Sequence, residues 1–267
     1  MSSASAGAGS GAQACFFAPA SCGFPDGSDT GVPAGTVLKP RGSFTISTRG
    51  AVVSGLDVTG TVTIAASDVT LMDSRIMPSA GATGIAVRYS GVSGVVIEHV
   101  EIDGADHSPS AVGITGSGFI VEAANIHGTA DAIDVGSNDV VRDSWIHDLF
   151  VVPGDHTDGV QSSGGANVVI SHNTINAEGS HVNSAVILGA DLGPLINSVV
   201  IGNLLAGGGF TVYAGTNGTY SSGVITIADN RFVKDDNYGP CSFKPSPGAT
   251  ISATGNVWDA GIPGAVC

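Results

Sequence analysis

The sequence has few basic residues, and this excludes one large class of functions. Its 267 residues include 9 Lys and Arg against 23 Asp and Glu, which gives a formal net charge of −14. Proteins that bind nucleic acid hold the phosphates with clustered Lys and Arg. This chain has too few cations to form such a cluster, so we expect no nucleic-acid partner.

Long hydrophobic runs are missing as well. Gly, Ser, Asn or Asp interrupts every apolar stretch far short of the roughly 20 residues that cross a bilayer, so we expect no membrane partner. Only 12% of the residues are charged, whereas 42% are apolar and 40 are Gly. Disordered chains show the opposite balance. The composition therefore predicts a folded chain.

Only four cysteines are present, two near each end of the chain: Cys15, Cys22, Cys241 and Cys267. This placement predicts the disulfides Cys15–Cys22 and Cys241–Cys267 and an extracellular, oxidising location. Four free thiols are the alternative. Residues 1–14, rich in Gly, Ser and Ala, lack the basic start and apolar core of a signal peptide, and we interpret them as a flexible tail. Secretion is thus inferred from the cysteines.

An eight-residue phrase with apolar residues at alternate positions recurs nine times, as in VTLMDSRI ending at Ile76 and VVISHNTI ending at Ile175. The alternation is typical of a strand with one buried face, and no helical stripe is sustained. One position of the last four phrases holds an amide side chain: Asn173, Asn203, Asn230 and Asn256. In a stack of coils these amides would bond one another.

A second strand accompanies each phrase, with apolar anchors that include Val112, Ile133, Val160, Phe210 and Phe243. Strands repeated without a helical crossover predict an all-β fold, a single right-handed parallel β-helix of about nine coils with disulfide-stapled ends. Its open strand edges need covering, and we assign residues 15–45 to an N-terminal cap and 46–267 to the helix with a C-terminal cap. A β-sandwich, with hairpin turns every 8 to 12 residues or so, is the alternative.

Aspartates and histidines gather on two neighbouring coils near the middle of the rod. The anchors align Asp131 with Asp158, so their carboxyls should lie about 5 Å apart on adjacent strands. Such carboxyls cannot both ionise freely, and divided pKa values suit a general acid paired with a base or nucleophile. We predict Asp131 and Asp158 as the catalytic pair, assisted by Asp134 and His156. The predicted sugar contacts are Arg88, His127, Gln161, His181, Tyr213 and Lys244.

The same carboxylates suggest a second chemistry. Their oxygens are ligands of the kind that Ca²⁺ prefers, and a bound cation could acidify the α-proton of a uronate for elimination, with His156 or Lys244 as base. Hydrolysis needs no cofactor. Because Asp before Gly is common in turns, a non-catalytic glycan-binding, adhesion or ice-binding rod is a third interpretation. The possible calcium ligands are Asp131, Asp134, Asp155 and Asp158.

Three segments carry a family resemblance: TGVPAGTVLKP, DHTDGVQSSGGANVVISHNTI and GNVWDAG. On them, from about Thr30 to Gly261, the chain resembles the secreted pectate-lyase-fold β-helix proteins common in actinobacteria, which implies a glycan partner. TADAID and HTDG are similar to motifs of polygalacturonase-type glycoside hydrolases, whose aspartates act as acid and base from neighbouring coils. This resemblance implies those roles for Asp131 and Asp158, with Asp134 assisting. We therefore expect a secreted, monomeric enzyme that hydrolyses polysaccharide, with calcium-assisted elimination or glycan binding alone as alternatives.

Overall fold

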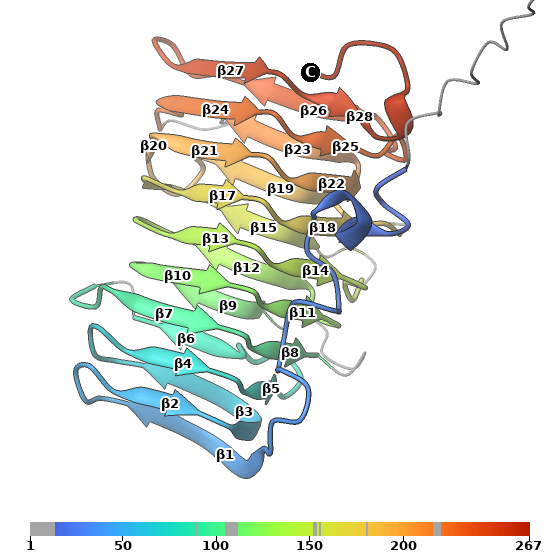
Figure 1. Cartoon of the computed structure of the whole chain (residues 1–267). Coiled ribbons are helices and arrows are strands. Elements are labelled where there is room, and N and C mark those ends of the chain that lie inside the picture. The colour runs from blue at the N-terminus through green and yellow to red at the C-terminus, as the bar shows by residue number, and fades with distance from the viewer. Residues whose placement is uncertain are drawn as a thin grey trace, which may run out of the picture.

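The structure, a computed structural model, describes residues 14–88, 90–104, 112–151, 154, 156–179, 181–215 and 220–267. These residues form a rod of stacked coils with almost no helix (Figure 1). The strands of neighbouring coils pair in parallel. The predicted all-β, right-handed parallel β-helix is confirmed. In the part of the chain described, no helix has the length and apolarity needed to cross a membrane.

Each coil contributes strands to three faces. The first face is a nine-stranded sheet of β2 (Val52–Ser54), β4 (Thr70–Met72), β7 (Val95–Glu98), β10 (Phe119–Glu122), β13 (Val140–Arg142), β17 (Val169–Ser171), β21 (Ser198–Ile201), β24 (Val224–Ala228) and β27 (Thr250–Thr254). The second face holds β3 (Leu56–Ile64), β5 (Arg75–Met77), β8 (Glu101–Asp103), β11 (Asn125–His127), β14 (Trp145–His147), β18 (Thr174–Ala177), β22 (Leu204–Gly207), β25 (Arg231–Phe232) and β28 (Val257–Trp258). The third face holds β1 (Lys39–Ile46), β6 (Ile85–Val87), β9 (Val112–Gly116), β12 (Asp131–Val135), β15 (Asp158–Ser162), β19 (Ser184–Gly189), β23 (Phe210–Gly215) and β26 (Gly239–Lys244).

The rod has about seven complete turns, whereas the sequence predicts about nine coils. In the first coil, β3 runs on from the second face to the third, where it pairs with β1 and β6. The last coil ends after β28 in the short 3₁₀ helix η2 (Asp259–Gly261). A two-stranded sheet of β16 (Gly165–Ala166) and β20 (Leu195–Ile196) lies outside the three faces. Terminal coils depart from the repeat because each must also close one end of the core.

The core follows from the repeated phrase. Its predicted inward residues stand in register through the nine-stranded sheet, for example Val141 between Val121 and Ile170. All members of this column from Leu71 to Ile227 are fully buried. Branched aliphatic side chains suit this position because they pack well on a pleated surface that a neighbouring strand continues on each side.

The predicted asparagine stack is present at the turn before the second face. The Nδ2 of Asn173 donates to Oδ1 of Asn203 at 2.9 Å, and Asn203 donates in the same way to Asn230. Asn230 donates to Oδ1 of Asn256 at 3.0 Å. Each Oδ1 also accepts the backbone N–H of the Asn in the preceding coil. The stack therefore satisfies buried polar groups that a turn inside the rod would otherwise leave unpaired.

On the third face, three of the predicted anchors are wrong by two residues. Ile133 pairs with Ile114 and Val160, not with Val112. Towards the C-terminus, Val186 pairs with Val212, which pairs with Cys241. Val212 and Cys241 thus replace the predicted Phe210 and Phe243. Apolar residues stand at both alternate positions in these strands, so a slip of two residues preserves the inward pattern and sequence alone does not fix the register.

The segment of residues 14–38, here called the strap, lies along the outside of the rod rather than over one end (Figure 1). The backbone N–H of Cys15 donates to Asp259 of the last coil at 3.0 Å. Farther along, Gly31 N–H donates to Ala123 O at 2.8 Å, and Lys39 N–H donates to Gly55 O at 2.9 Å. This path differs from that of the predicted cap at 15–45, because a segment without repeats carries no register to show where it docks. The division of the chain at residue 46 stays a prediction.

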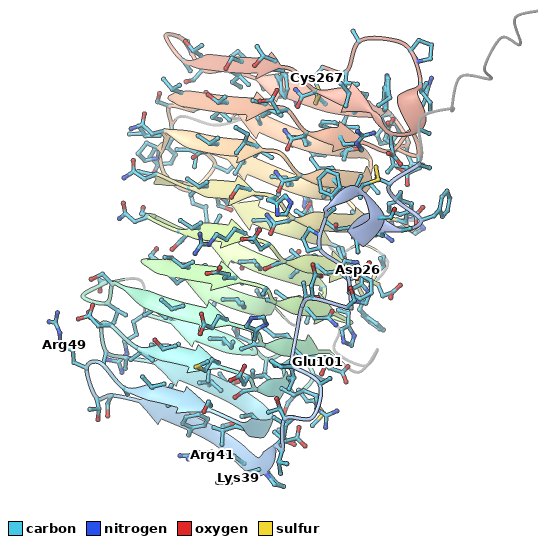
Figure 2. The ribbon with its side chains drawn as sticks, in the orientation of Figure 1. Asp26, Lys39, Arg41, Arg49, Glu101 and Cys267 are labelled. Atoms are coloured by element: carbon cyan, nitrogen blue, oxygen red, sulfur yellow. A yellow bond between two sulfur atoms is a disulfide. The ribbon has the colours of Figure 1, made fainter. Side chains whose placement is uncertain are left out.

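Both predicted disulfides are confirmed. Cys15 is bonded to Cys22 within the strap, next to the 3₁₀ helix η1 (Pro19–Cys22). Cys241 of β26 is bonded to Cys267, which ties the chain end to the last complete turn. Figure 2 shows Cys267 at that end of the rod and Lys39 and Arg41 at the other. The cross-links therefore fasten the two segments that lie outside the regular repeat.

Candidate functional site

The central aspartates lie on β12 and β15, which are neighbours on the third face. Ile133 and Asp134 of β12 pair with Val160 and Gln161 of β15. The backbone N–H of Asp158 donates to Oδ1 of Asp131 at 2.9 Å. Residues separated by 27 positions in the sequence are thereby brought into direct contact. The aspartates predicted from the aligned strands do gather at one place.

Asp158 is fully enclosed. Its side chain has no exposed surface, and Oδ1 accepts hydrogen bonds from Asn183 Nδ2 at 2.9 Å and from the Ser184 hydroxyl. The other oxygen, Oδ2, is buried with no hydrogen-bond partner among the described residues. Burial raises the pKa of Asp158, although the bonds from Ser184 and Asn183 oppose the shift. Asp158 thus favours its neutral form more than an exposed aspartate does.

Asp134 lies at the surface of the same cluster. It is partly exposed, and its Oδ1 is buried without a hydrogen-bond partner in the described chain. Burial, followed by the negative charge of Asp158, raises the pKa of Asp134 to about 6. A carboxyl with such a pKa is partly protonated near neutral pH and can donate that proton. Of the two carboxyls with raised pKa values in this cluster, Asp134 is the one open to solvent.

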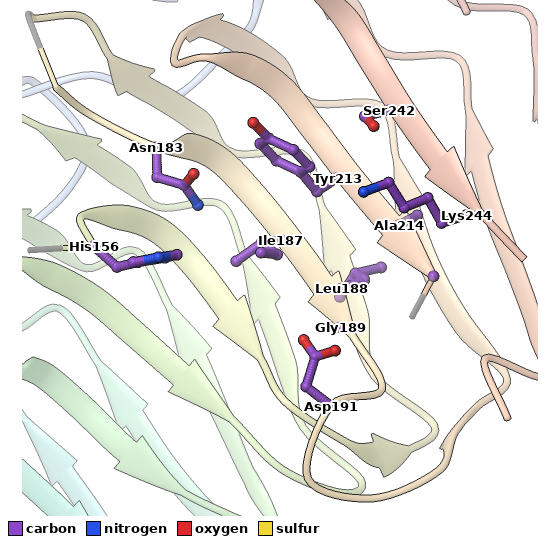
Figure 3. A pocket seen from close by; sticks show the side chains of 11 residues that line it. His156, Asn183, Ile187, Leu188, Gly189, Asp191, Tyr213, Ala214, Ser242 and Lys244 are labelled. Carbon is purple, nitrogen blue, oxygen red and sulfur yellow. The ribbon is translucent and has the colours of Figure 1, made fainter. Parts of the chain in front are cut away.

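Three adjoining pockets follow this face, and we refer to them together as the groove. One is lined by Asp134 and Gln161. The second, which we call the central pocket, has a volume of about 160 Å³ and is lined by His156, Tyr213 and Lys244 among others. The third adds His181 and shares His156 and Tyr213 with the second. Figure 3 shows His156 on one side of the second pocket and Lys244 on the other, with Tyr213 between them.

The groove therefore contains most of the predicted sugar contacts, but not all. Gln161, His181, Tyr213 and Lys244 line it, as does His156. Arg88 lies exposed just after β6 and lines none of the three pockets. Lys244 pairs with Gly215 rather than with the column of Gln161, because of the two-residue shift in register. Burial raises the pKa of Tyr213, which keeps its hydroxyl protonated.

His127 belongs to a different set of contacts, on the second face. Its Nε2 lies 3.4 Å from Glu101 Oε1, and its ring stacks on that of His147 with centroids 5.1 Å apart. The hydrogen bond with Glu101 raises the pKa of His127. The His147 ring in turn stacks on Trp145 at 3.5 Å. His127 and His147 are thus stacked on neighbouring coils, but neither contacts Asn183 or Ser184, the residues that bond the Asp158 carboxyl, in any hydrogen bond described here.

The aspartates do not offer the geometry of a calcium site. Within the described ranges, no three His, Cys, Asp or Glu side chains are grouped so as to hold a metal ion. Asp158 is enclosed and bonded to Ser184 and Asn183, and its raised pKa and that of Asp134 weaken both as anionic ligands. Asp155, the fourth predicted ligand, lies outside the described residues. The residues present do not fit Ca²⁺, and we derive no step through it.

Sequence reasoning missed Asn183 and Ser184. They stand one coil after Thr157 and Asp158, and β19 pairs Ser184 with Asp158. A serine aligned with an aspartate carries no chemical signal in sequence. Only the contacts show that these two residues hold the Asp158 carboxyl.

Comparisons with known proteins support the fold. The sequence matches no protein-family model and no curated protein. Among solved structures, an alginate lyase from Paenibacillus has a TM-score of 0.59 and 13% identity, covering 81% of this chain and 88% of its own. The fold is shared. It is also shared with the catalytic unit of an α-1,3-glucanase from Streptomyces thermodiastaticus, at TM-score 0.54 and 15% identity over 79% of this chain and 50% of that one.

A third similar structure is the enzymatically active domain of tailspike protein 2 of bacteriophage CBA120. Its TM-score is 0.53 at 11% identity, covering 83% of this chain and 38% of that chain. The chain therefore spans about half or less of the glucanase and tailspike chains that it resembles. At these identities the likeness establishes a right-handed parallel β-helix and nothing further about chemistry.

Proposed function

We propose that this protein cleaves polysaccharide, and that it does so by hydrolysing glycosidic bonds in the groove on the third face. The observation that carries the proposal is Asp134, a partly exposed carboxyl whose pKa is raised to about 6 beside the enclosed Asp158. Glycosidases need such a carboxyl to protonate the leaving oxygen. The three similar structures, named as a lyase, a glucanase and a tailspike enzyme, agree with a role on glycans.

The roles of the aspartates differ from the pairing that the sequence suggested. Asp158 has no exposed surface, so we assign it to positioning: after burial, which is the larger cause, its negative charge raises the pKa of Asp134. Asp131 is partly exposed and takes the role of base.

The groove supplies the remaining parts of a glycan site. Tyr213 and Gln161 offer hydrogen-bond donors to sugar hydroxyls, and His156 and Lys244 are the basic side chains of the central pocket. We further propose that the protein acts as a monomer outside the cell, where its two disulfides persist. Polysaccharide is then its partner.

The test is cleavage of a panel of neutral and uronate polysaccharides, read as new reducing ends and as the ultraviolet absorbance of unsaturated uronate. Asp134→Asn should lower kcat at least about 100-fold, while Asp229→Asn, the same change on an exposed turn, should leave it unaltered. Reducing ends without absorbance support hydrolysis. Cleavage that survives Asp134→Asn would contradict the assignment, and a chain that binds glycan but cleaves none would be a binding rod.

One observation favours a second candidate, which is elimination without a metal. His156 and Lys244 face the central pocket and could remove the α-proton of a uronate, while the protonated Tyr213 could donate to the leaving oxygen. Reducing ends accompanied by ultraviolet absorbance, unchanged by EDTA and lost in Lys244→Met, would favour this candidate over hydrolysis.

A further inference from the structure

A second pocket of ligand size lies away from the groove, between the strap and the second face. It encloses about 490 Å³, within the range of small-molecule sites. Phe16, Phe17 and Ser28 line it from the strap, and Trp145 and Thr174 line it from β14 and β18. The groove, by contrast, is lined from the third face. This pocket has no part in the function proposed above.

The pocket is held in a fixed shape. The carboxylate of Asp259, which is 4% exposed, accepts the backbone N–H groups of Cys15 and Phe16 at 3.0 and 3.1 Å. The Cys15–Cys22 disulfide closes the loop that carries both phenylalanines. On the opposite side, the strap crosses the indole of Trp145 so closely that a Cβ on Gly27 would lie 2.9 Å from it. The backbone that carries Phe16 and Phe17 is thereby tied to the rod, as is the strap where it crosses Trp145.

Aromatic rings form the part of the lining that is most open to a ligand. Phe17 is 87% exposed and stacks edge-on against Phe16, with ring centroids 5.7 Å apart. Thr174 is 2% exposed and its hydroxyl oxygen is buried, so a ligand in the pocket does not reach that oxygen. An exposed aromatic ring offers a face on which the apolar side of a sugar ring can stack.

The charge of the pocket indicates which class of sugar it can bind. Among the described residues that line it, Asp26 is the only one with a charge, and its carboxylate already accepts bonds from Ser28 and from Ala20 N–H. A uronate would meet this negative charge with no cation to balance it. We propose that the strap pocket binds a neutral pyranose unit of a polysaccharide, stacked against Phe17. It would hold the chain at a distance from the groove.

Binding rather than activity tests this proposal, so that its failure is separable from that of the proposed hydrolysis. An array of neutral and uronic oligosaccharides identifies ligands of the full chain, and titration calorimetry then measures the tightest neutral hexasaccharide. We expect Phe17→Ala to weaken that binding about 3- to 10-fold. Phe17→Tyr keeps the aromatic face, so we expect it to bind like the parent.

Two further variants serve as controls. Val37→Ala alters another exposed strap residue outside the pocket and should leave affinity unchanged. Val52→Ala alters an exposed residue of β2 on the first face and should also leave it unchanged. The proposal is overturned if no neutral oligosaccharide binds, if uronic ligands bind as tightly in this pocket, or if Phe17→Ala binds like the parent.

Discussion

The asparagine stack gives a stability prediction whose size follows from its contacts. In Asn203→Ala four buried hydrogen bonds are lost. Two of these bonds run to Asn203 Oδ1 from the backbone N–H and Nδ2 of Asn173, and two run from Asn203 Nδ2 to Ile170 O and Asn230 Oδ1. Asn173 Nδ2 keeps its bond to Val141 O, and Asn230 Oδ1 keeps the backbone N–H of residue 203. At about 1 kcal/mol for each net bond, the free energy of unfolding should fall by about 4 kcal/mol.

Guanidinium unfolding followed by circular dichroism measures this change, and thermal unfolding gives a second reading. For a domain of this size, about 4 kcal/mol corresponds to a Tm lower by about 8 to 16 °C. The matched control is Asn237→Ala, which removes from an exposed side chain one part-buried bond to Gly208 O and should cost less than about 1 kcal/mol.

A third variant, at the end of the asparagine stack, tests whether the loss of stability depends on burial. Asn256 ends the row and is only partly buried, so water can replace part of what Asn256→Ala removes. We expect its cost to fall between those of the Asn203 and Asn237 changes. If Asn203→Ala unfolds at the same denaturant concentration as Asn237→Ala, the stack contributes nothing net to stability and the reasoning is refuted.

Three other changes test the packing, the cross-links and the site. A Cβ on Gly159 would lie 2.5 Å from the backbone of the next coil, so Gly159→Ala should lower the free energy of unfolding by about 2 kcal/mol or more. The control Gly42→Ala places its Cβ in open space and should lower it by less than about 0.5 kcal/mol. Equal unfolding midpoints for the two variants would contradict this packing. Cys267→Ser opens a 26-residue loop and should lower the free energy of unfolding by about 3 kcal/mol. An unchanged unfolding midpoint would show that packing alone holds the last coil. The pKa of Asp134 in the folded protein, about 6, exceeds the ordinary value of 3.8 for an aspartate, so its stabilising contribution is present below about pH 4 and is lost as pH rises through about 6. Relative to the parent, Asp134→Asn should therefore be more stable at about pH 7.5 than at about pH 4. Identical pH profiles for the two proteins would show that the pKa of this carboxyl is not raised.

Much of the fold could be predicted from the sequence because a solenoid repeats the same residue pattern in each coil. The column from Leu71 to Ile227 and the amides from Asn173 to Asn256 recur at fixed places in successive phrases, and stacking coils turns a recurring position into a physical row. The paired cysteines followed from their placement at the ends. These features need only periodicity and local chemistry.

The register of the third face was not readable, since Phe210 and Val212 both satisfy an alternating pattern of period two. The choice between them is made by the pairing of complete neighbouring strands. The path of the strap likewise depends on distant partners, such as Asp259 for Cys15 and Ala123 for Gly31. No repeat encodes these contacts.

For the candidate site, too, some features could be predicted from the sequence and others could not. The sequence by itself determined that Asp131, Asp134 and Asp158 would share neighbouring strands, because equivalent positions of adjacent coils meet. Only the tertiary structure decided which carboxyl faces solvent and which is enclosed, since that depends on Asn183 and Ser184 of the next coil. Burial, not residue type, separates the exposed acid from the enclosed carboxyl, and burial is a property of the assembled rod.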